Sequence, residues 1–96
     1  MMSATAKTAT WSFLTNHSHV IVCLTKDPEM RVRDLALQIG ITERAVIRIL
    51  GDLEQEGVIE RIKKGRRNHY VLHLEQHLQH PLENHSTIGD LIRSVT

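Results

Sequence analysis

Residues 32–57 read VRDLALQIGITERAVIRILGDLEQEG, and two helical patterns meet there at a glycine. The first pattern covers residues 33–39 and stops at Gly40, a residue that readily takes the positive φ of a helix end. The second begins after Thr42, which suits an N-cap, although the full capping box fails because Ala45 stands where a Glu or Gln is needed. The stretch predicts two helices joined by a short turn.

The second helix carries the strongest periodic signal in the chain. Its apolar residues recur at positions i, i+3, i+4 and i+7, which places them on one face of a helix of about four turns ending at Gly57. These residues are Val46, Ile49, Leu50 and Leu53. The opposite face is therefore free to contact something other than the protein core.

A basic hairpin is predicted directly after this helix. Residues 58–63 and 69–74 have strand patterns, and the segment between them contains the turn-forming residues Gly65 and Asn68. No acid occurs in residues 61–70, so the positive charge is local, as a nucleic-acid contact requires.

The remaining segments complete the predicted layout. Apolar residues between 11 and 26 predict a buried helix, interrupted or recapped near residues 16–18, and residues 30–32 form a short β-prone stretch. A polar, histidine-rich connection after the hairpin leads to a short amphipathic helix. We expect a flexible tail over residues 1–10, a winged-helix domain over 11–74, and a linker with a dimerisation helix over 75–96.

Two helices joined by a glycine turn and followed by a basic hairpin are the ingredients of a winged helix-turn-helix. Residues 11–74 resemble the winged-helix transcription regulators of the MarR/ArsR type, and the resemblance to the helix-turn-helix signature extends over residues 32–53. It implies an α+β, mainly helical fold with a three-helix core, a β-hairpin wing and a C-terminal helix. It also implies sequence-specific binding of double-stranded DNA by a transcription regulator, with repression as the expected outcome.

The predicted DNA contacts lie on the free helix face and on the wing. Arg44 and Arg48 lie one turn apart and suit bidentate contacts to guanine, whereas Thr42 and Glu43 suit phosphate and cytosine. Ile47 fits either a thymine methyl group or a partly buried core position. The alternative interpretation of these charges is an ordinary solvated surface. The full predicted set is Thr42, Glu43, Arg44, Ile47, Arg48, Lys63, Lys64, Arg66, Arg67 and Asn68.

The small size of the chain favours a homodimer. A chain of 96 residues buries only about two-thirds of its unfolded surface, so association offers further burial. Apolar residues near the two ends of the chain are the expected interface: Trp11, Phe13, Leu14, Ile88, Leu91, Ile92 and Val95.

Composition and motifs exclude several other classes. The chain is 41% hydrophobic and 24% charged, which fits a folded globular domain, and its single cysteine, Cys23, forms neither an intrachain disulfide nor a CxxC metal knuckle. We expect a cytoplasmic protein without a membrane segment or a cofactor. A Gly-rich phosphate loop and paired catalytic acids are both missing from the sequence, so an enzyme is not expected.

The late histidines leave an alternative open. His73, His77, His80 and His85 would approach metal-ligand spacing in a suitable fold, but the cysteine-containing motif of the metal-sensing ArsR-type repressors is missing. Exposed or interface histidines are the simpler interpretation, and no metal site is predicted. A metal- or ligand-responsive repressor and a winged helix used only for protein contacts remain the alternatives.

Overall fold

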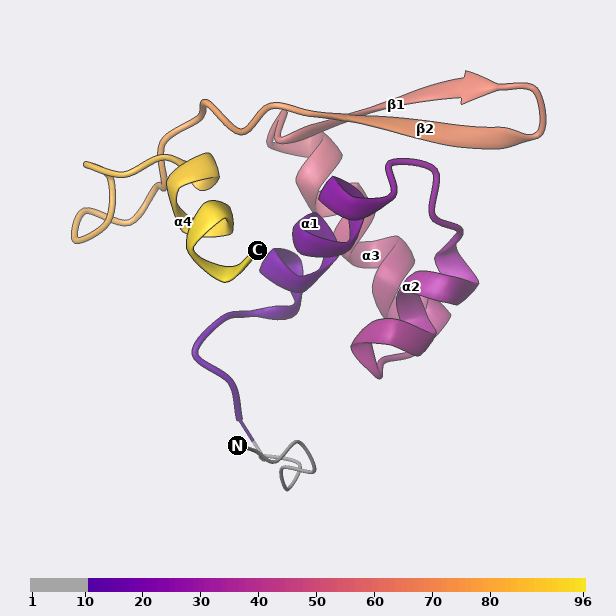
Figure 1. Ribbon diagram of the computed structural model, residues 1–96, viewed down its shortest axis with the longest axis horizontal. Helices are drawn as coiled ribbons and strands as arrows, with labels where there is room; N and C mark the ends of the chain where they lie inside the picture. The colour runs from indigo at the N-terminus through magenta and orange to yellow at the C-terminus, as the bar shows by residue number, and fades with distance from the viewer. Residues whose placement is uncertain (1–10) are drawn as a thin grey trace.

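The computed structural model describes residues 11–96, so the predicted tail over residues 1–10 lies outside the described part. In this described part, four helices and one antiparallel hairpin follow each other along the chain (Figure 1). The elements are α1 (Asn16–Lys26), α2 (Val32–Ile39), α3 (Glu43–Gln55), β1 (Ile59–Lys64), β2 (Arg67–Leu72) and α4 (Ile88–Val95). The α+β, mainly helical fold predicted from the sequence is confirmed.

The turn between α2 and α3 forms where the sequence places it. Gly40 closes α2 with φ +86°, and the backbone N–H groups of Gly40 and Ile41 both donate to the carbonyl oxygen of Ala36, at 2.8 and 3.1 Å. Thr42 caps α3 because its Oγ accepts from the backbone N–H of Ala45 at 3.0 Å. These bonds satisfy groups that helix ends leave unpaired, and they fix where α3 starts.

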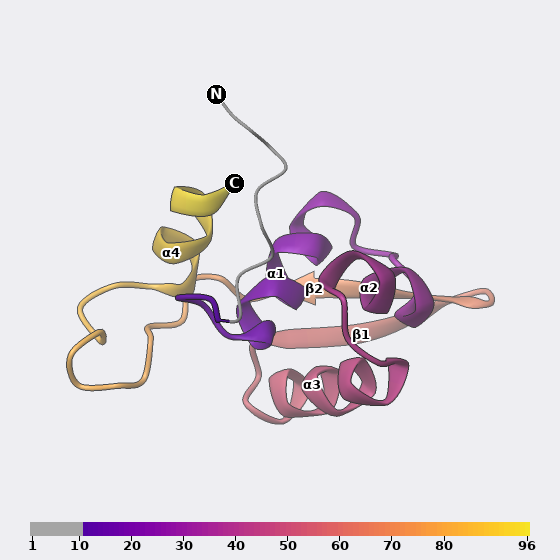
Figure 2. The ribbon, with the colours of Figure 1, turned by 90° about the horizontal axis from the view of Figure 1, so that it is seen from below.

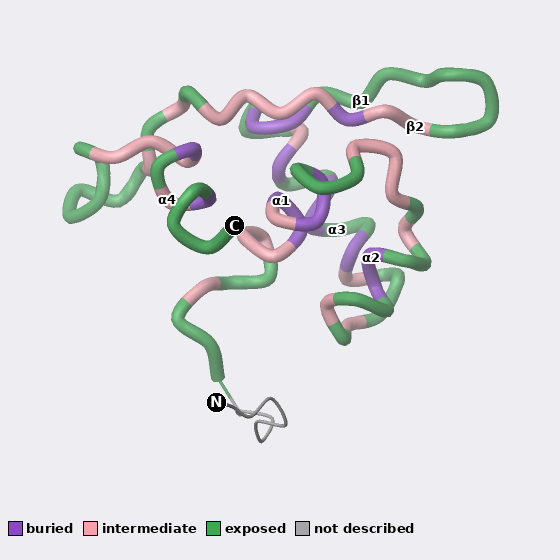
Figure 3. Tube along the Cα trace, in the orientation of Figure 1, coloured by how far each residue is buried: buried purple, intermediate pink, exposed green. Residues whose placement is uncertain are grey.

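The predicted apolar stripe of α3 lies in the core. Its residues Val46, Ile49, Leu50 and Leu53 are at most 8% exposed, and they pack in one cluster with residues of α1 and α2 (Figure 3). The buried partners on α1 include Cys23, where burial raises the pKa of the thiol and Lys26 offsets part of the rise. The three helices therefore form the predicted core.

The turn of the hairpin is tighter than the sequence suggests, and both strands are shifted toward it. β1 and β2 pair from Ile59 opposite Leu72 to Lys64 opposite Arg67, which leaves only Gly65, with φ +63°, and Arg66 at the tip. The predicted five-residue turn is wrong because the cross-strand pairing continues through residues 63, 64, 67 and 68.

Tyr70 fastens the hairpin to the helices. Its backbone N–H donates to the carbonyl oxygen of Pro28 at 2.9 Å, and its side chain is only 4% exposed. Burial raises the pKa of the Tyr70 phenol, and the nearby Arg61 offsets part of that rise. The wing is thus anchored to the loop that precedes α2.

Two local predictions are wrong. Residues 11–14 are not part of a buried helix, because α1 begins at Asn16 and leaves Trp11 and Phe13 67% and 90% exposed. The two rings contact each other edge to face, with centroids 4.9 Å apart. Residues 30–32 form no strand, because Val32 already belongs to α2.

The C-terminal helix α4 is tied to the segment after the hairpin. The N–H groups of Ile88 and Gly89 donate to the carbonyl oxygens of Gln76 and Leu74, both at 2.8 Å. Ile92 is 3% exposed and belongs to the core of its own chain, so the expectation that it lies at a dimer surface is wrong.

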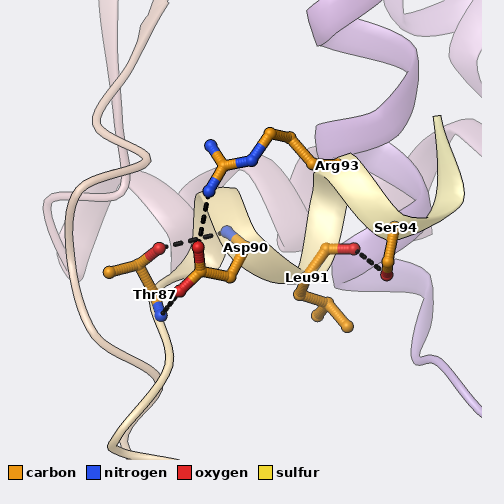
Figure 4. Close-up of polar contacts among 5 residues, drawn as sticks. All are labelled: Thr87, Asp90, Leu91, Arg93 and Ser94. Atoms are coloured by element: carbon orange, nitrogen blue, oxygen red, sulfur yellow. Dashed lines mark hydrogen bonds and ion pairs between the residues drawn. The ribbon is translucent and has the colours of Figure 1, made fainter.

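A capping box starts α4 (Figure 4). Thr87 Oγ accepts from the N–H of Asp90 at 3.0 Å, and Asp90 Oδ2 accepts from the N–H of Thr87 at 2.9 Å. The bond from the Thr87 backbone is the main cause that lowers the pKa of Asp90, and Arg93 adds a smaller effect. A membrane span would need a longer and more apolar helix than any formed by residues 11–96.

Two alanine substitutions test the turn between α2 and α3. Gly40→Ala puts a side chain into the left-handed region and is expected to lower the free energy of unfolding by about 1–2 kcal/mol. Gly51→Ala is the matched control: it lies inside α3 at ordinary helical φ, and alanine there is expected to raise stability by about 0.5–1 kcal/mol. Neither added Cβ meets a neighbouring atom within 4 Å. Urea unfolding measures both, and equal effects of the two substitutions would contradict the turn geometry.

The lowered pKa of Asp90 gives a pH dependence with a definite sign. A carboxyl group with a lowered pKa stabilises the fold above its ordinary pKa of 3.8, and this contribution is lost as the pH falls through the lower, folded-state value. Asp90→Asn is therefore expected to destabilise the protein at pH 7, and the difference from the parent should shrink steadily below pH 3.8. Urea unfolding at several pH values measures this difference, and one that stays constant down to low pH would contradict the capping box.

Candidate nucleic-acid interface

The outer face of α3 carries two exposed arginines. Arg44 and Arg48 lie opposite the buried stripe, and within residues 11–96 neither forms an ion pair or a side-chain hydrogen bond. Ile47 between them is 60% exposed, so it is a surface residue and not part of the core. The face therefore presents two free guanidinium groups beside one apolar side chain. Each guanidinium is planar and carries five N–H donors.

The start of α3 adds polar groups to this face. Thr42 and Glu43 are both exposed. Thr42 Oγ accepts from Ala45 N–H, which leaves the hydroxyl hydrogen able to donate to an outside acceptor. The helix N-terminus also carries a partial positive charge, which favours an anion there.

The wing supplies a second cationic surface. Lys63, Lys64 and Arg66 are fully on the surface, and among the described residues none of the three has an ion-pair partner. Arg67 differs from them because its Nη2 donates to the carbonyl oxygen of Glu29 at 3.0 Å. Asn68 is half-buried at the base of the tip. The predicted wing cations therefore comprise three free residues and Arg67, which also holds the wing in place.

Glu29 is a positioning residue that the sequence did not reveal. Its backbone carbonyl accepts from Arg67, and its carboxylate Oε2 lies 3.1 Å from Nδ1 of His69. Both contacts join residues about forty positions apart in the sequence. No local pattern marks such a contact.

Arg31 is a second residue that sequence reasoning missed. It precedes α2, and its side chain does not cap that helix. It lines a shallow hollow of about 210 Å³ together with Arg66, Arg67 and Tyr70. A basic residue directly before a predicted helix-turn-helix was the available signal.

The start of α3 and the turn of the hairpin lie at the same end of the molecule. Figures 1 and 2 show both on the right-hand side, whereas α4 lies at the opposite end. The two cationic surfaces therefore belong to the same end of the molecule.

The late histidines do not gather. His73 lies 3.4 Å from Glu60 and 3.8 Å from Glu75, and His77 Nδ1 lies 2.9 Å from the carbonyl oxygen of Asn84. Over residues 11–96, no group of three or more His, Cys, Asp or Glu side chains is placed to hold a metal ion. His80 and His85 are exposed on the loop before α4.

A family model identifies the architecture. Residues 15–60 match the model described as winged helix-turn-helix DNA-binding, and the matched segment runs from α1 to the start of the hairpin. This part of the chain has the winged helix-turn-helix fold. The second helix of the helix-turn-helix motif is α3, and the wing is the hairpin of β1 and β2. The family resemblance predicted from residues 32–53 is confirmed at this level.

Two solved structures with TM-scores above 0.5 show the same fold, and a third structure is less similar. A predicted DNA-binding transcriptional regulator from E. coli is 15% identical, with a TM-score of 0.57, over 81% of this chain and 70% of that one. A MarR-family transcription regulator is 21% identical, with a TM-score of 0.52, over 85% of this chain and 48% of that one. The zinc-dependent MarR-family regulator AdcR, in its Zn(II)-bound state, is 26% identical, with a TM-score of 0.49, over 68% and 46%. This chain thus spans about half the length of the two MarR-family structures. No curated protein matches the sequence.

Proposed function

We propose that the protein is a transcription regulator that binds double-stranded DNA in a sequence-specific way. The observation that carries the proposal is a pair of exposed arginines on α3, which have no partner within residues 11–96 and lie on the face opposite the buried stripe of a winged helix-turn-helix. A helix of this motif enters the major groove, where Arg reads guanine O6 and N7 bidentately. Arg44 and Arg48 are the proposed base-reading residues.

The other predicted contacts have supporting roles in this proposal. Thr42 would donate its free hydroxyl to a phosphate, Glu43 would accept from a cytosine amino group, and Ile47 would pack on a thymine methyl group. Lys63, Lys64 and Arg66 would attract the phosphate backbone, and Asn68 would donate to a phosphate. Arg67 would set the position of the tip.

We propose that a homodimer is the binding unit. Six of the predicted interface residues are accessible to a partner, whereas Ile92 is not. Large apolar surfaces are exposed at Trp11, Phe13 and Val95, and half-buried ones lie at Leu14, Ile88 and Leu91. Two-fold symmetry would then set half-sites one DNA turn apart, about 34–36 Å. A bound dimer would obstruct a promoter, which supports repression as the outcome. A cytoplasmic location agrees with a DNA-binding role and with a single, unpaired cysteine.

The wing is tested by the salt dependence of DNA binding. Each phosphate contact contributes a slope of about −0.9 to log K against log salt concentration, so Lys64→Ala with Arg66→Ala is expected to flatten the slope by about 2. Arg93→Ala, which removes a cation from α4 at the far end of the molecule, is the control and should leave the slope unchanged. Fluorescence anisotropy with a labelled duplex measures it. Equal slopes for all variants would contradict a wing on the phosphate backbone.

Base reading is tested on α3. Arg44→Ala is expected to cost about 1–3 kcal/mol on the preferred sequence and to relax the preference at one base-pair position. Gln55→Ala, exposed in the last turn of α3, is the control and should leave the preference intact. Selection of binding sequences from a random pool by parent and variants measures this, and an unchanged preference for the Arg44 variant would assign base reading elsewhere.

Substitutions that introduce charge at the proposed dimer surface test whether the protein is a dimer. Phe13→Glu together with Val95→Glu places two carboxylates where apolar side chains would meet, which is expected to shift the protein to a monomer. Leu37→Glu introduces a charge at an exposed leucine of α2 outside the proposed interface and serves as the control. Sedimentation equilibrium measures the mass, and a parent protein that is already monomeric would contradict the proposal.

A further inference from the structure

An apolar groove with an acidic rim lies at the end of α3 that faces away from the proposed DNA contacts. One hollow of about 290 Å³ and an adjoining one of about 100 Å³ share five lining residues, so they form a continuous depression. We call this depression the α3-end groove, and its shared lining residues are His17, Leu53, Val58, Leu78 and Ile88. Its size approaches the lower end of small-molecule sites, about 300–1,000 Å³.

The floor of the α3-end groove is apolar. Leu53 lies in α3 and Val58 directly precedes β1, and each is 8% exposed. Leu78 lies between β2 and α4, Ile88 is the first residue of α4, and both are half-buried. An apolar group of a ligand that lies on this floor would be removed from water, which stabilises the complex by about 25 cal/mol per Å² of buried apolar surface.

The rim of the groove carries two carboxylates, and one of them, Asp52, is paired with His17. Asp52 and Glu56 line it, and within residues 11–96 neither hollow is lined by a lysine or an arginine. The last turn of α3 contains no basic residue either, so the negative end of the helix dipole adds to the charge of the two carboxylates. Anions are disfavoured here, and cations are attracted.

The carboxylates have partners that orient them without closing the groove. Asp52 Oδ2 lies 2.9 Å from His17 Nε2, and Glu56 Oε1 accepts from Gln79 Nε2 at 3.0 Å. Both acids are still exposed, and Asp52 keeps a second carboxylate oxygen for a further donor. The side-chain amide of Gln76 donates to the carbonyl oxygen of Gly57 at 2.7 Å and so holds one wall.

We propose that the α3-end groove binds a small organic cation, a primary ammonium carried on an apolar group. The apolar group would lie on Leu53, Val58, Leu78 and Ile88, and the ammonium would donate to Asp52 and Glu56. None of the predicted DNA contacts lines this site, so it does not depend on the DNA-binding proposal. Ile88 also belongs to the proposed dimer surface, so the cation and a second protein copy would compete for the groove.

Three probes of similar size and different charge test the proposal: 2-phenylethylammonium, the neutral 2-phenylethanol and the anionic phenylacetate. Their binding to the full-length protein without DNA is followed by amide chemical shifts. We expect the ammonium to shift the residues around Leu53, Val58 and Ile88 and to bind at least about tenfold more tightly than phenylacetate, a difference of about 1.4 kcal/mol. Equal binding of the three probes, shifts located elsewhere, or no binding at all would overturn the proposal; the last result is also what a second protein copy seated in the groove would give.

Charge variants distinguish a built site from general attraction to the protein. Asp52→Asn and Glu56→Gln should each reduce the preference for the ammonium over the alcohol by a factor of about 3 or more, as expected for loss of one charge-assisted hydrogen bond. Asp34→Asn, which removes one exposed carboxylate from α2, is the matched control and should leave the preference unchanged. An equal effect of all three substitutions would show that net charge, and not the groove, selects the cation.

Discussion

The burial of one stripe of α3 fixes the direction in which the rest of that helix points. Val46, Ile49, Leu50 and Leu53 lie within the core, and burial of such a side chain stabilises a protein by about 1.5–3 kcal/mol. Rotation of α3 by even a third of a turn would expose several of these residues together. The helix therefore has one favourable orientation, and Arg44 and Arg48 point outward as a consequence of packing on the other side.

A second constraint holds the wing. The hairpin is joined to the loop before α2 by the backbone bond from Tyr70 to Pro28 and by the contacts of Arg67 and His69 with Glu29. These bonds give the wing a defined direction, although its two strands alone would be only marginally stable in water. Of the cations at the tip, those without such bonds are the ones free to contact a phosphate backbone.

Much of the fold could be predicted from local pattern. The glycine turn, the Thr42 cap and the stripe of α3 each depend on residues close together in the sequence, and helix periodicity makes the exposed face follow from the buried one. The long-range features could not be predicted in this way. Glu29 and the wing are separated by about forty residues, and the exposure of Trp11 and Phe13 depends on where α1 begins, which the apolar composition of residues 11–14 does not reveal. Ile92 shows the same limit, because an amphipathic pattern predicts a buried face without saying whether the same chain or a partner covers it.

The most direct test of the account is to map where DNA contacts the protein. Amide chemical shifts are recorded while a short mixed-sequence duplex is added to the isotope-labelled protein. The account predicts shifts along the outer face of α3 and at Lys63, Lys64 and Arg66, with α4 and the loop before it unchanged. Shifts confined to α4, or none at any DNA concentration at low salt, would contradict it.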